Sequence, residues 1–268
     1  MELTPPNYKF ARKQMPFDPQ NNLEKSLIKA ASDPAHRPQF YKDLAGSDFF
    51  IVQEGPPPES SGKMVLPKGT SLQLQHIEWE ERSYIPVFSS LSRLQATIQE
   101  EVGYLALNAV EFMKITQGAE LLLNPGSDYS KAFTKEEITS IVDGSIWKPT
   151  EQYVAQKDTK VMIGQPSNYP KKLIEALTRY FKGTKQVKKA YIAQFFNPED
   201  GEKPHTLIAV QVDSDWEPVM AGAGMVARDS EVPDPPVDFL QITGLGGFED
   251  YFKKNCKPFY KRKFLGIF

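Results

Sequence analysis

The sequence predicts an α+β protein of two mixed domains, and three observations support this prediction. Short apolar runs typical of strands alternate with segments of helical periodicity along most of the 268 residues. The length suggests two domains at roughly 150 residues each, and a short linker begins near residue 147. After this linker the expected order is β-α-β-β-α-β-α, which suggests a split-βαβ, ferredoxin-like sheet with helices on one face.

Three segments are expected along the chain. Residues 1–21 carry four prolines without any periodicity, which indicates an extended or disordered arm. Residues 22–148 are expected to form the first domain, and residues 155–268 the second.

In the first domain, capping residues and glycine stops delimit the expected helices. Asn21 and Glu24 stand at capping-box spacing before the first helix, and Thr134 and Glu137 form a second box. Gly46 is a typical C-terminal stop. The helices are expected to begin near residues 22, 38, 91, 110 and 135, and the strands to cover 49–52, 71–79, 84–88, 104–107 and 121–123.

The second domain has the clearer pattern. Leu173, Ile174, Leu177 and Phe181 lie on one face of an expected helix. A turn near residue 198 separates two runs that are expected to pair as a hairpin. The expected helices are 171–182, 215–228 and 248–260, and the expected strands are 161–163, 187–196, 206–212 and 237–243.

Composition excludes several functional classes. The chain has 32 basic and 34 acidic residues, so it is neither a strongly basic nucleic-acid binder nor an acidic tail. One cysteine cannot form an internal disulfide or a Cys-rich zinc site, and three scattered histidines disfavour a histidine metal centre. No apolar run approaches the ~20 residues of a membrane helix, and the N-terminus lacks signal-peptide features. A cytoplasmic location is therefore expected.

Glycine motifs and the cysteine do not indicate a cofactor or a reaction. Residues 222–227 fit G-x-G-x-x-A, but a helical segment precedes them and a proline loop follows, so close helix packing is favoured over dinucleotide binding. Residues 244–247 are interpreted as a plain turn because the Lys-Ser/Thr of a phosphate loop is missing. Cys256 is interpreted as a packed thiol. No catalytic, cofactor-binding or metal-ligating residue is predicted.

Basic residues gather in two segments of the second domain. Residues 171–189 hold seven basic residues and one acid, and residues 253–268 hold six basic residues and no acid. Aromatic residues interleave with the second group. A basic stripe with aromatic residues can bind an acidic protein, a nucleic acid or a membrane, although solvated helix faces are the favoured interpretation of charge runs. The candidate partner-binding residues are Lys257, Phe259, Tyr260, Lys261, Arg262, Lys263, Lys182 and Lys185.

Four short motifs resemble those of a known bacterial family. They are residues 29–41 (KAASDPAHRPQFY), 85–91 (IPVFSSL), 206–213 (TLIAVQVD) and 258–262 (PFYKR). In this order the motifs resemble the SseB, or enhanced serine-sensitivity, family. The resemblance implies an N-terminal and a C-terminal SseB domain in a cytoplasmic protein, without an established reaction. His36, Arg37 and Pro38 match the family motif, although a helix-junction proline with a capping role would also account for them.

A non-enzymatic protein that binds an unidentified partner protein is therefore the leading functional hypothesis. It is supported by the missing catalytic motifs, the resemblance and the basic–aromatic C-terminal segment. A small-molecule sensor or an enzyme with a pocket between the domains is the second hypothesis. Nucleic-acid binding through a basic stripe is the weaker third one.

Overall fold

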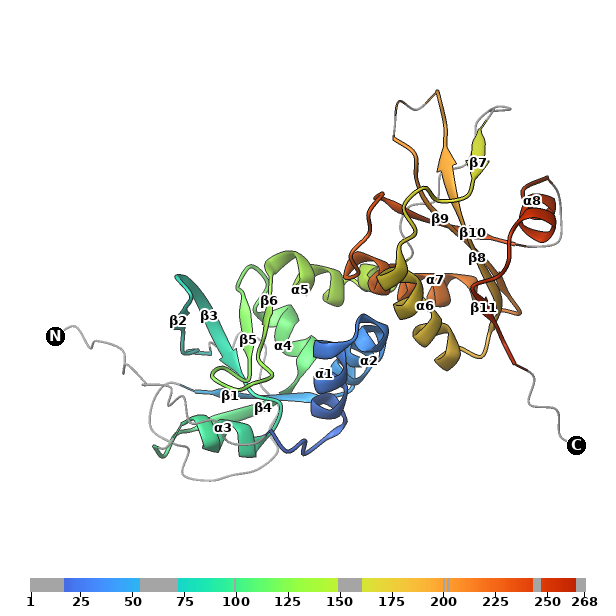
Figure 1. Ribbon diagram of the computed structural model, residues 1–268. Coiled ribbons are helices and arrows are strands. Elements are labelled where there is room, and N and C mark those ends of the chain that lie inside the picture. The colour runs from blue at the N-terminus through green and yellow to red at the C-terminus, as the bar shows by residue number, and fades with distance from the viewer. Residues whose placement is uncertain are drawn as a thin grey trace, which may run out of the picture. The chain divides into compact units, whose positions relative to one another are not determined.

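The chain forms two compact units (Figure 1). The computed structural model describes residues 17–53, 72–98, 100–148, 161–199, 201, 203–242 and 247–263, without the side chains of residues 247–249. The first unit contains the described residues up to Ala31 together with Gln39–Ile146, and the second contains Ser32–Pro38 with the described residues from Trp147 onward. The predicted α+β class is confirmed.

The first unit consists of helices packed against short strands. Its helices are α1 (Asn22–Ser32), α2 (Arg37–Ala45), α3 (Leu91–Thr97), α4 (Ala109–Ile115) and α5 (Lys135–Val142), with the 3₁₀ turn η2 (Ser145–Trp147). Its strands are β1 (Asp48–Val52), β2 (Ile77–Trp79), β3 (Arg82–Val87), β4 (Tyr104–Asn108), β5 (Leu121–Leu123) and β6 (Lys131–Phe133).

Two small sheets meet in this unit. One has the order β2-β3-β5-β6, with β3 and β5 parallel, and the other pairs β1 with β4 in antiparallel orientation. Phe50 and Phe88 exchange two backbone hydrogen bonds of 2.9 Å, so the end of β3 is continuous with β1. Phe40, Phe49 and Phe133 are fully buried together in the core.

The second unit has the predicted order β-α-β-β-α-β-α followed by a short additional strand. It contains the 3₁₀ turn η1 (Pro34–His36), the strands β7 (Met162–Gly164), β8 (Val187–Phe196), β9 (His205–Val212), β10 (Val237–Gln241) and β11 (Tyr260–Lys261), and the helices α6 (Lys171–Gly183), α7 (Trp216–Arg228) and α8 (Gly247–Asn255).

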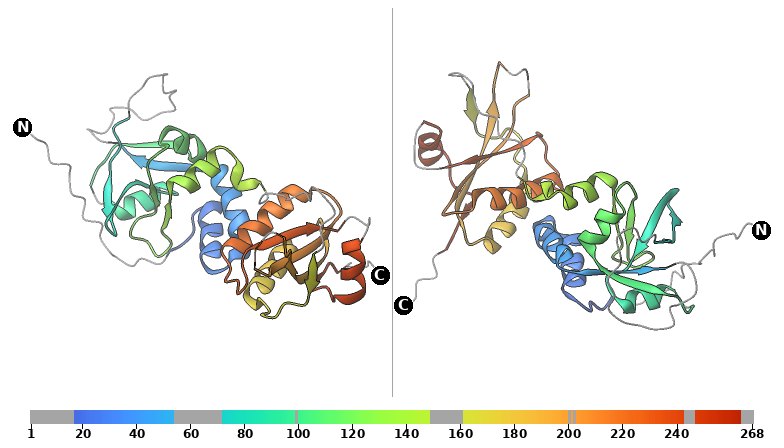
Figure 2. Two further views of the ribbon diagram at one scale, coloured as in Figure 1. Left: turned by 90° about the horizontal axis from the view of Figure 1, so that it is seen from above. Right: turned by 180° about the vertical axis from the view of Figure 1, so that it is seen from behind.

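The sheet of this unit differs from the predicted ferredoxin-like arrangement in two respects. Its order is β10-β9-β8-β11, and β7 pairs antiparallel with β8 directly instead of being separated from it by another strand. The helices α6 and α7 lie side by side on one face (Figures 1 and 2), whereas Phe252 of α8 packs on the other face. The prediction of helices on one face is wrong for α8, because alternate residues of β8 and β9 are apolar on both faces and both faces need a cover.

Helix α8 is shorter than predicted. It ends at Asn255 instead of continuing to residue 260, and Tyr260–Lys261 pairs as β11 with β8. Pro258 accounts for the difference, since proline lacks an N–H donor and disfavours a helical conformation in the residue before it.

The interpretation of residues 222–227 as closely packed helix is confirmed. They lie within α7, and a Cβ atom added to Gly222 would meet the Tyr180 hydroxyl of α6 at 2.0 Å. The turn predicted at residues 244–247 falls mainly outside the described residues. Within the described part of the chain, no helix is long and apolar enough to cross a membrane.

Candidate functional site

A groove of about 560 Å³ opens beside strand β8 in the second unit. Three segments supply its walls: the β7–α6 connection, the middle of β8, and the turn between α8 and β11. The lining residues are Gln165, Tyr169, Ile192, Asn255, Lys257, Pro258 and Phe259. Two of the predicted partner-binding residues, Lys257 and Phe259, are thus part of one concave surface.

The floor of the groove is an unpaired stretch of the β8 edge. Strands β7 and β11 both pair with this edge, β7 as far as Gly164↔Gln194 and β11 as far as Tyr260↔Ala190. Ile192 lies two residues from both Ala190 and Gln194, whose backbone groups pair with β11 and β7, so its own N–H and C=O face the same edge, between these two strands. Among the described residues, no backbone group bonds to the N–H or C=O of Ile192 on that side.

Two prolines keep this edge open. Extending the β7 register would place Pro166 opposite Ile192, and extending the β11 register backward would place Pro258 there. Proline has no N–H, so neither strand can donate to the Ile192 carbonyl, and both ladders end before they reach it.

Aromatic residues support one wall of the groove. The Phe259 ring lies 6.3 Å from that of Phe181 in α6, in a stacked geometry. Tyr260 is 8% exposed and donates a 2.9 Å hydrogen bond from its hydroxyl to the Phe181 carbonyl, which holds β11 in place. Tyr169 stands at the groove with 54% of its surface exposed.

The basic segments meet along the β8–β11 ladder. Lys189 and Lys261 are direct cross-strand partners, and neither forms an ion pair with a described residue. Like charges directly opposite each other destabilise a ladder unless an anion compensates them. By contrast, Lys188 and Arg262 both pair with Asp213, and their hydrogen bonds hold the pKa of the Asp213 carboxyl below its usual range.

The predicted binding residues therefore fall into separate groups. Lys257 and Phe259 line the groove, and Lys261 lies beside Lys189. Tyr260 and Arg262 have structural partners, and Arg262 also donates to the Lys185 carbonyl. Lys182, Lys185 and Lys263 are exposed and lie outside the groove lining. The partner-binding role of these eight residues stays a prediction.

The residues that match the family motif lie at the helix junction. Asp33 caps η1 by accepting a 3.0 Å hydrogen bond from the Ala35 N–H, and it also receives bonds from Arg179 at 2.6 and 3.2 Å. His36 is the last residue of η1, Arg37 pairs with Asp229, and Pro38 is the second residue of α2. This geometry supports the structural interpretation of the motif.

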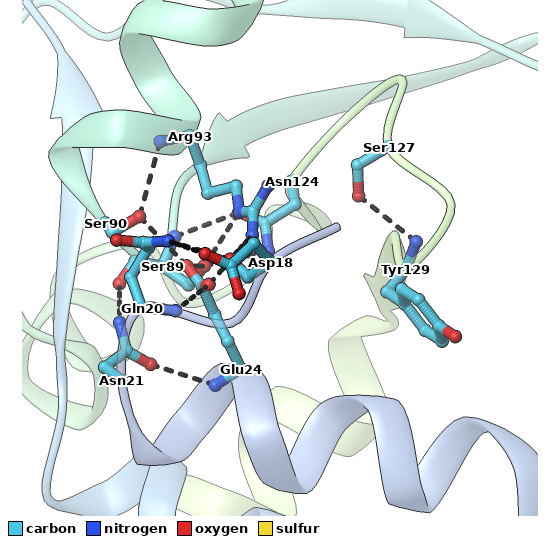
Figure 3. A network of polar contacts seen from close by, with 10 residues as sticks. All are labelled: Asp18, Gln20, Asn21, Glu24, Ser89, Ser90, Arg93, Asn124, Ser127 and Tyr129. Carbon is cyan, nitrogen blue, oxygen red and sulfur yellow. Dashed lines mark hydrogen bonds and ion pairs between the residues drawn. The ribbon is translucent and has the colours of Figure 1, made fainter. Parts of the chain in front are cut away.

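A buried polar network in the first unit was not predicted (Figure 3). The Glu24 carboxylate is fully buried and accepts hydrogen bonds from the Gln20 N–H, the Ser89 and Ser90 hydroxyls, and Arg93, at 2.7–3.1 Å. Burial alone would raise the pKa of Glu24, but these hydrogen bonds outweigh it and lower the pKa. One of the two hydrogen bonds of the predicted capping box is present, because Asn21 Oδ1 accepts from the Glu24 N–H. The Glu24 carboxylate accepts from the Gln20 N–H, one residue before the expected donor.

Asn124 completes this network. It has a φ of +50° and bonds to both the N–H and the hydroxyl of Ser89. Ser89, Glu24 and Asn124 are at most 3% exposed, so the serine hydroxyl is enclosed by its own partners. Two features of the sequence could have indicated this network: the Ser89–Ser90 pair in the motif at residues 85–91, and the glutamate that directly follows Leu23. The network holds the start of α1 to the start of α3.

Other reactive side chains lie apart from the groove floor. The Cys256 thiol is half-buried against the core near Phe252, with Sγ 3.5 Å from Gln165 Nε2. His205 is 2% exposed, and its Nε2 lies 2.8 Å from Asp238 Oδ2. In the part of the chain that is described, no three His, Cys, Asp or Glu residues are placed to hold a metal ion.

Comparisons with known proteins agree with the motifs. Residues 23–140 match the family model of the SseB protein N-terminal domain, and residues 155–262 match that of the SseB protein C-terminal domain. Protein SseB of Escherichia coli strain K12 and that of Shigella flexneri are each 30% identical over 250 residues, covering 92% of this chain and 95% of theirs. No solved structure matches. The chain belongs to the SseB family.

Proposed function

We propose that the chain is a non-enzymatic binding protein whose β8-edge groove receives a segment of another cytoplasmic protein. The observation that carries this proposal is the composition of the groove. Its described lining combines aromatic and apolar walls with two amides and one ammonium group, and it has no carboxylate, histidine or hydroxyl nucleophile beyond the Tyr169 phenol. Such a lining offers binding groups without an acid–base pair.

The surrounding charge supports a protein partner. The groove borders the two basic segments where they meet, and Lys189, Lys257 and Lys261 have no acidic partner among the described side chains. A potential of one sign beside an apolar groove steers an acidic surface toward it and fixes its orientation. In this proposal, the serine-sensitivity phenotype that gives the family its name follows from a regulatory contact with the partner.

Site-specific photo-cross-linking in bacterial cells tests the proposal. A benzophenone amino acid at position 169 is expected to give one protein adduct of defined mass, because Tyr169 lines the groove. The same amino acid at Glu217, an exposed position of α7, is the control and is expected to give none. Lys257→Glu should lower the yield by about tenfold, the effect of losing a charge-assisted hydrogen bond.

Two results would contradict this function. One is an equal set of adducts at positions 169 and 217, and the other is an adduct that Lys257→Glu leaves unchanged. If nucleic acid bound to the basic segments instead, affinity would fall steeply with salt and no protein adduct would form. A small-molecule ligand would raise the unfolding free energy by ~2.7 kcal/mol at 100 times its Kd, without an adduct.

A further inference from the structure

The groove is too short for a strand that runs through it. Ala190 and Gln194, the last residues of β8 that pair with β11 and β7, are four residues apart. At about 3.3 Å per residue, the open edge between them measures roughly 13 Å. A continuous strand that followed β8 would collide with β7 in one direction and with β11 in the other. A chain that ends at the open edge avoids one of these two collisions and has to leave the edge in one direction only.

Ile192 offers both main-chain groups to such a chain end. In an antiparallel hydrogen-bonded pair, one residue of the ligand donates its N–H to the Ile192 carbonyl and accepts from the Ile192 N–H. A terminal residue satisfies both requirements, because its own N–H is the donor and its carboxylate is the acceptor. One residue thus completes the ladder that Pro166 and Pro258 leave open.

Charge distinguishes between the two kinds of chain end. Lys257 lines the groove, and Lys189 and Lys261, which have no acidic partner among the described residues, face each other three residues from Ile192 along β8. Gln165 Nε2 adds a donor, since its bonds to the Asn255 carbonyl and Cys256 Sγ are long, at 3.4 and 3.5 Å. These groups attract a carboxylate and repel an N-terminal ammonium group.

We propose that the groove binds the C-terminal residue of a partner protein. The terminal carboxylate accepts from the Ile192 N–H and from Lys257, the terminal N–H donates to the Ile192 carbonyl, and an apolar last side chain packs between Tyr169 and Phe259. Capture of a chain terminus by main-chain groups is an established mode of peptide recognition. The inference rests on the proposed function and specifies which part of the partner is bound.

Peptides with defined ends test this inference on the full chain. The probe is a library of fluorescent heptapeptides with four random C-terminal residues and a free carboxylate. Enriched peptides are expected to end in an apolar residue and to bind about 10- to 100-fold more weakly when amidated. Lys257→Glu should weaken them by a similar factor, whereas Lys25→Glu, the same charge change at an exposed position of α1, should leave the Kd unchanged.

Hydrogen exchange at a single amide gives a second readout. The Ile192 amide should exchange more slowly when an enriched peptide is bound, and its amidated form should not protect it at equal concentration. The inference is wrong if no peptide is enriched, if amidated peptides bind equally well, or if the Ile192 amide is unaffected. A position-169 adduct that maps to an internal segment of the partner would leave the proposed function intact and overturn this inference alone.

Discussion

Replacement of Glu24 by alanine is expected to destabilise the first unit by about 3–5 kcal/mol, the cost of breaking a buried ion pair by removing one partner. The Arg93 side chain is 14% exposed and would lose its carboxylate partner. Its Nε is already buried without a hydrogen-bond partner among the described residues, and its guanidinium lies 3.6 Å from the centre of the Phe17 ring. Ser89 would lose its acceptor in the same enclosed space.

Hydrogen exchange with mass spectrometry separates this effect from a general loss of stability. Peptides from α1, α3 and β5 should exchange faster in Glu24→Ala, while peptides from α6 and α7 serve as an internal reference. Glu111→Ala is the matched control, because this carboxylate is 61% exposed and its one ion pair with a described residue is to Lys114 on its own helix. Its effect should stay within about 0.5 kcal/mol. Equal effects of the two variants would contradict a bracing role for Glu24.

The pH dependence of stability has a defined direction for Glu24. The pKa of this carboxyl is lower in the folded unit than in the unfolded chain, so its ionised form favours folding. This contribution is complete above the ordinary glutamate pKa of about 4.3 and is lost as pH falls through the lower folded value. Glu24→Gln should therefore flatten the loss of stability on acidification, as measured by urea unfolding from pH 7 to pH 3. An unchanged slope would contradict this assignment.

Alanine at Gly222 is expected to destabilise the second unit by about 1–3 kcal/mol, the usual cost of overpacking. The added Cβ would lie 2.0 Å from the Tyr180 hydroxyl oxygen and 2.6 Å from Cζ. Tyr180 cannot move without giving up the 3.2 Å hydrogen bond to the Val219 carbonyl. The expected loss is notable because alanine in a helix interior otherwise gains about 1 kcal/mol over glycine.

Two variants make this measurement specific. Gly183 is the last residue of α6, and a Cβ atom added there would meet no atom within 4 Å. Gly183→Ala should therefore be neutral or slightly stabilising in urea unfolding. Tyr180→Ala should remove most of the penalty of Gly222→Ala, with a coupling energy of about 0.5–3 kcal/mol. A stabilising Gly222→Ala would show that α6 and α7 do not approach this closely.

Local patterns in the sequence predicted the second unit well. The amphipathic run that starts at Lys171 and the apolar run 187–196 each contain their own periodicity, so α6 and β8 lie where they were expected. The strand β11 was missed because its partner is about 70 residues away in sequence and its two residues carry no period of their own. Pro258 is a local signal against a helix that continues to residue 260, but the helical periodicity on either side of it points the other way.

The site shows the same division between local and long-range information. The basic–aromatic composition of residues 257–263 is evident in the sequence, and three of these residues, Lys257, Pro258 and Phe259, line the groove. The open β8 edge arises from the registers of two ladders, and no local pattern specifies a register between distant strands. The Glu24 network was likewise hidden, because its serine and arginine partners lie 65–69 residues away along the chain.

The two prolines that flank the open β8 edge, Pro166 and Pro258, also affect the solubility of the protein. A long unpaired strand edge templates the addition of other chains and promotes aggregation, and natural proteins cover or interrupt such edges. Here Pro166 and Pro258 leave main-chain groups of β8 open around Ile192, while β7 and β11 shield the strand on both sides of it. The protein can thus present main-chain hydrogen-bonding groups to a partner on an edge too short to nucleate intermolecular β-sheet.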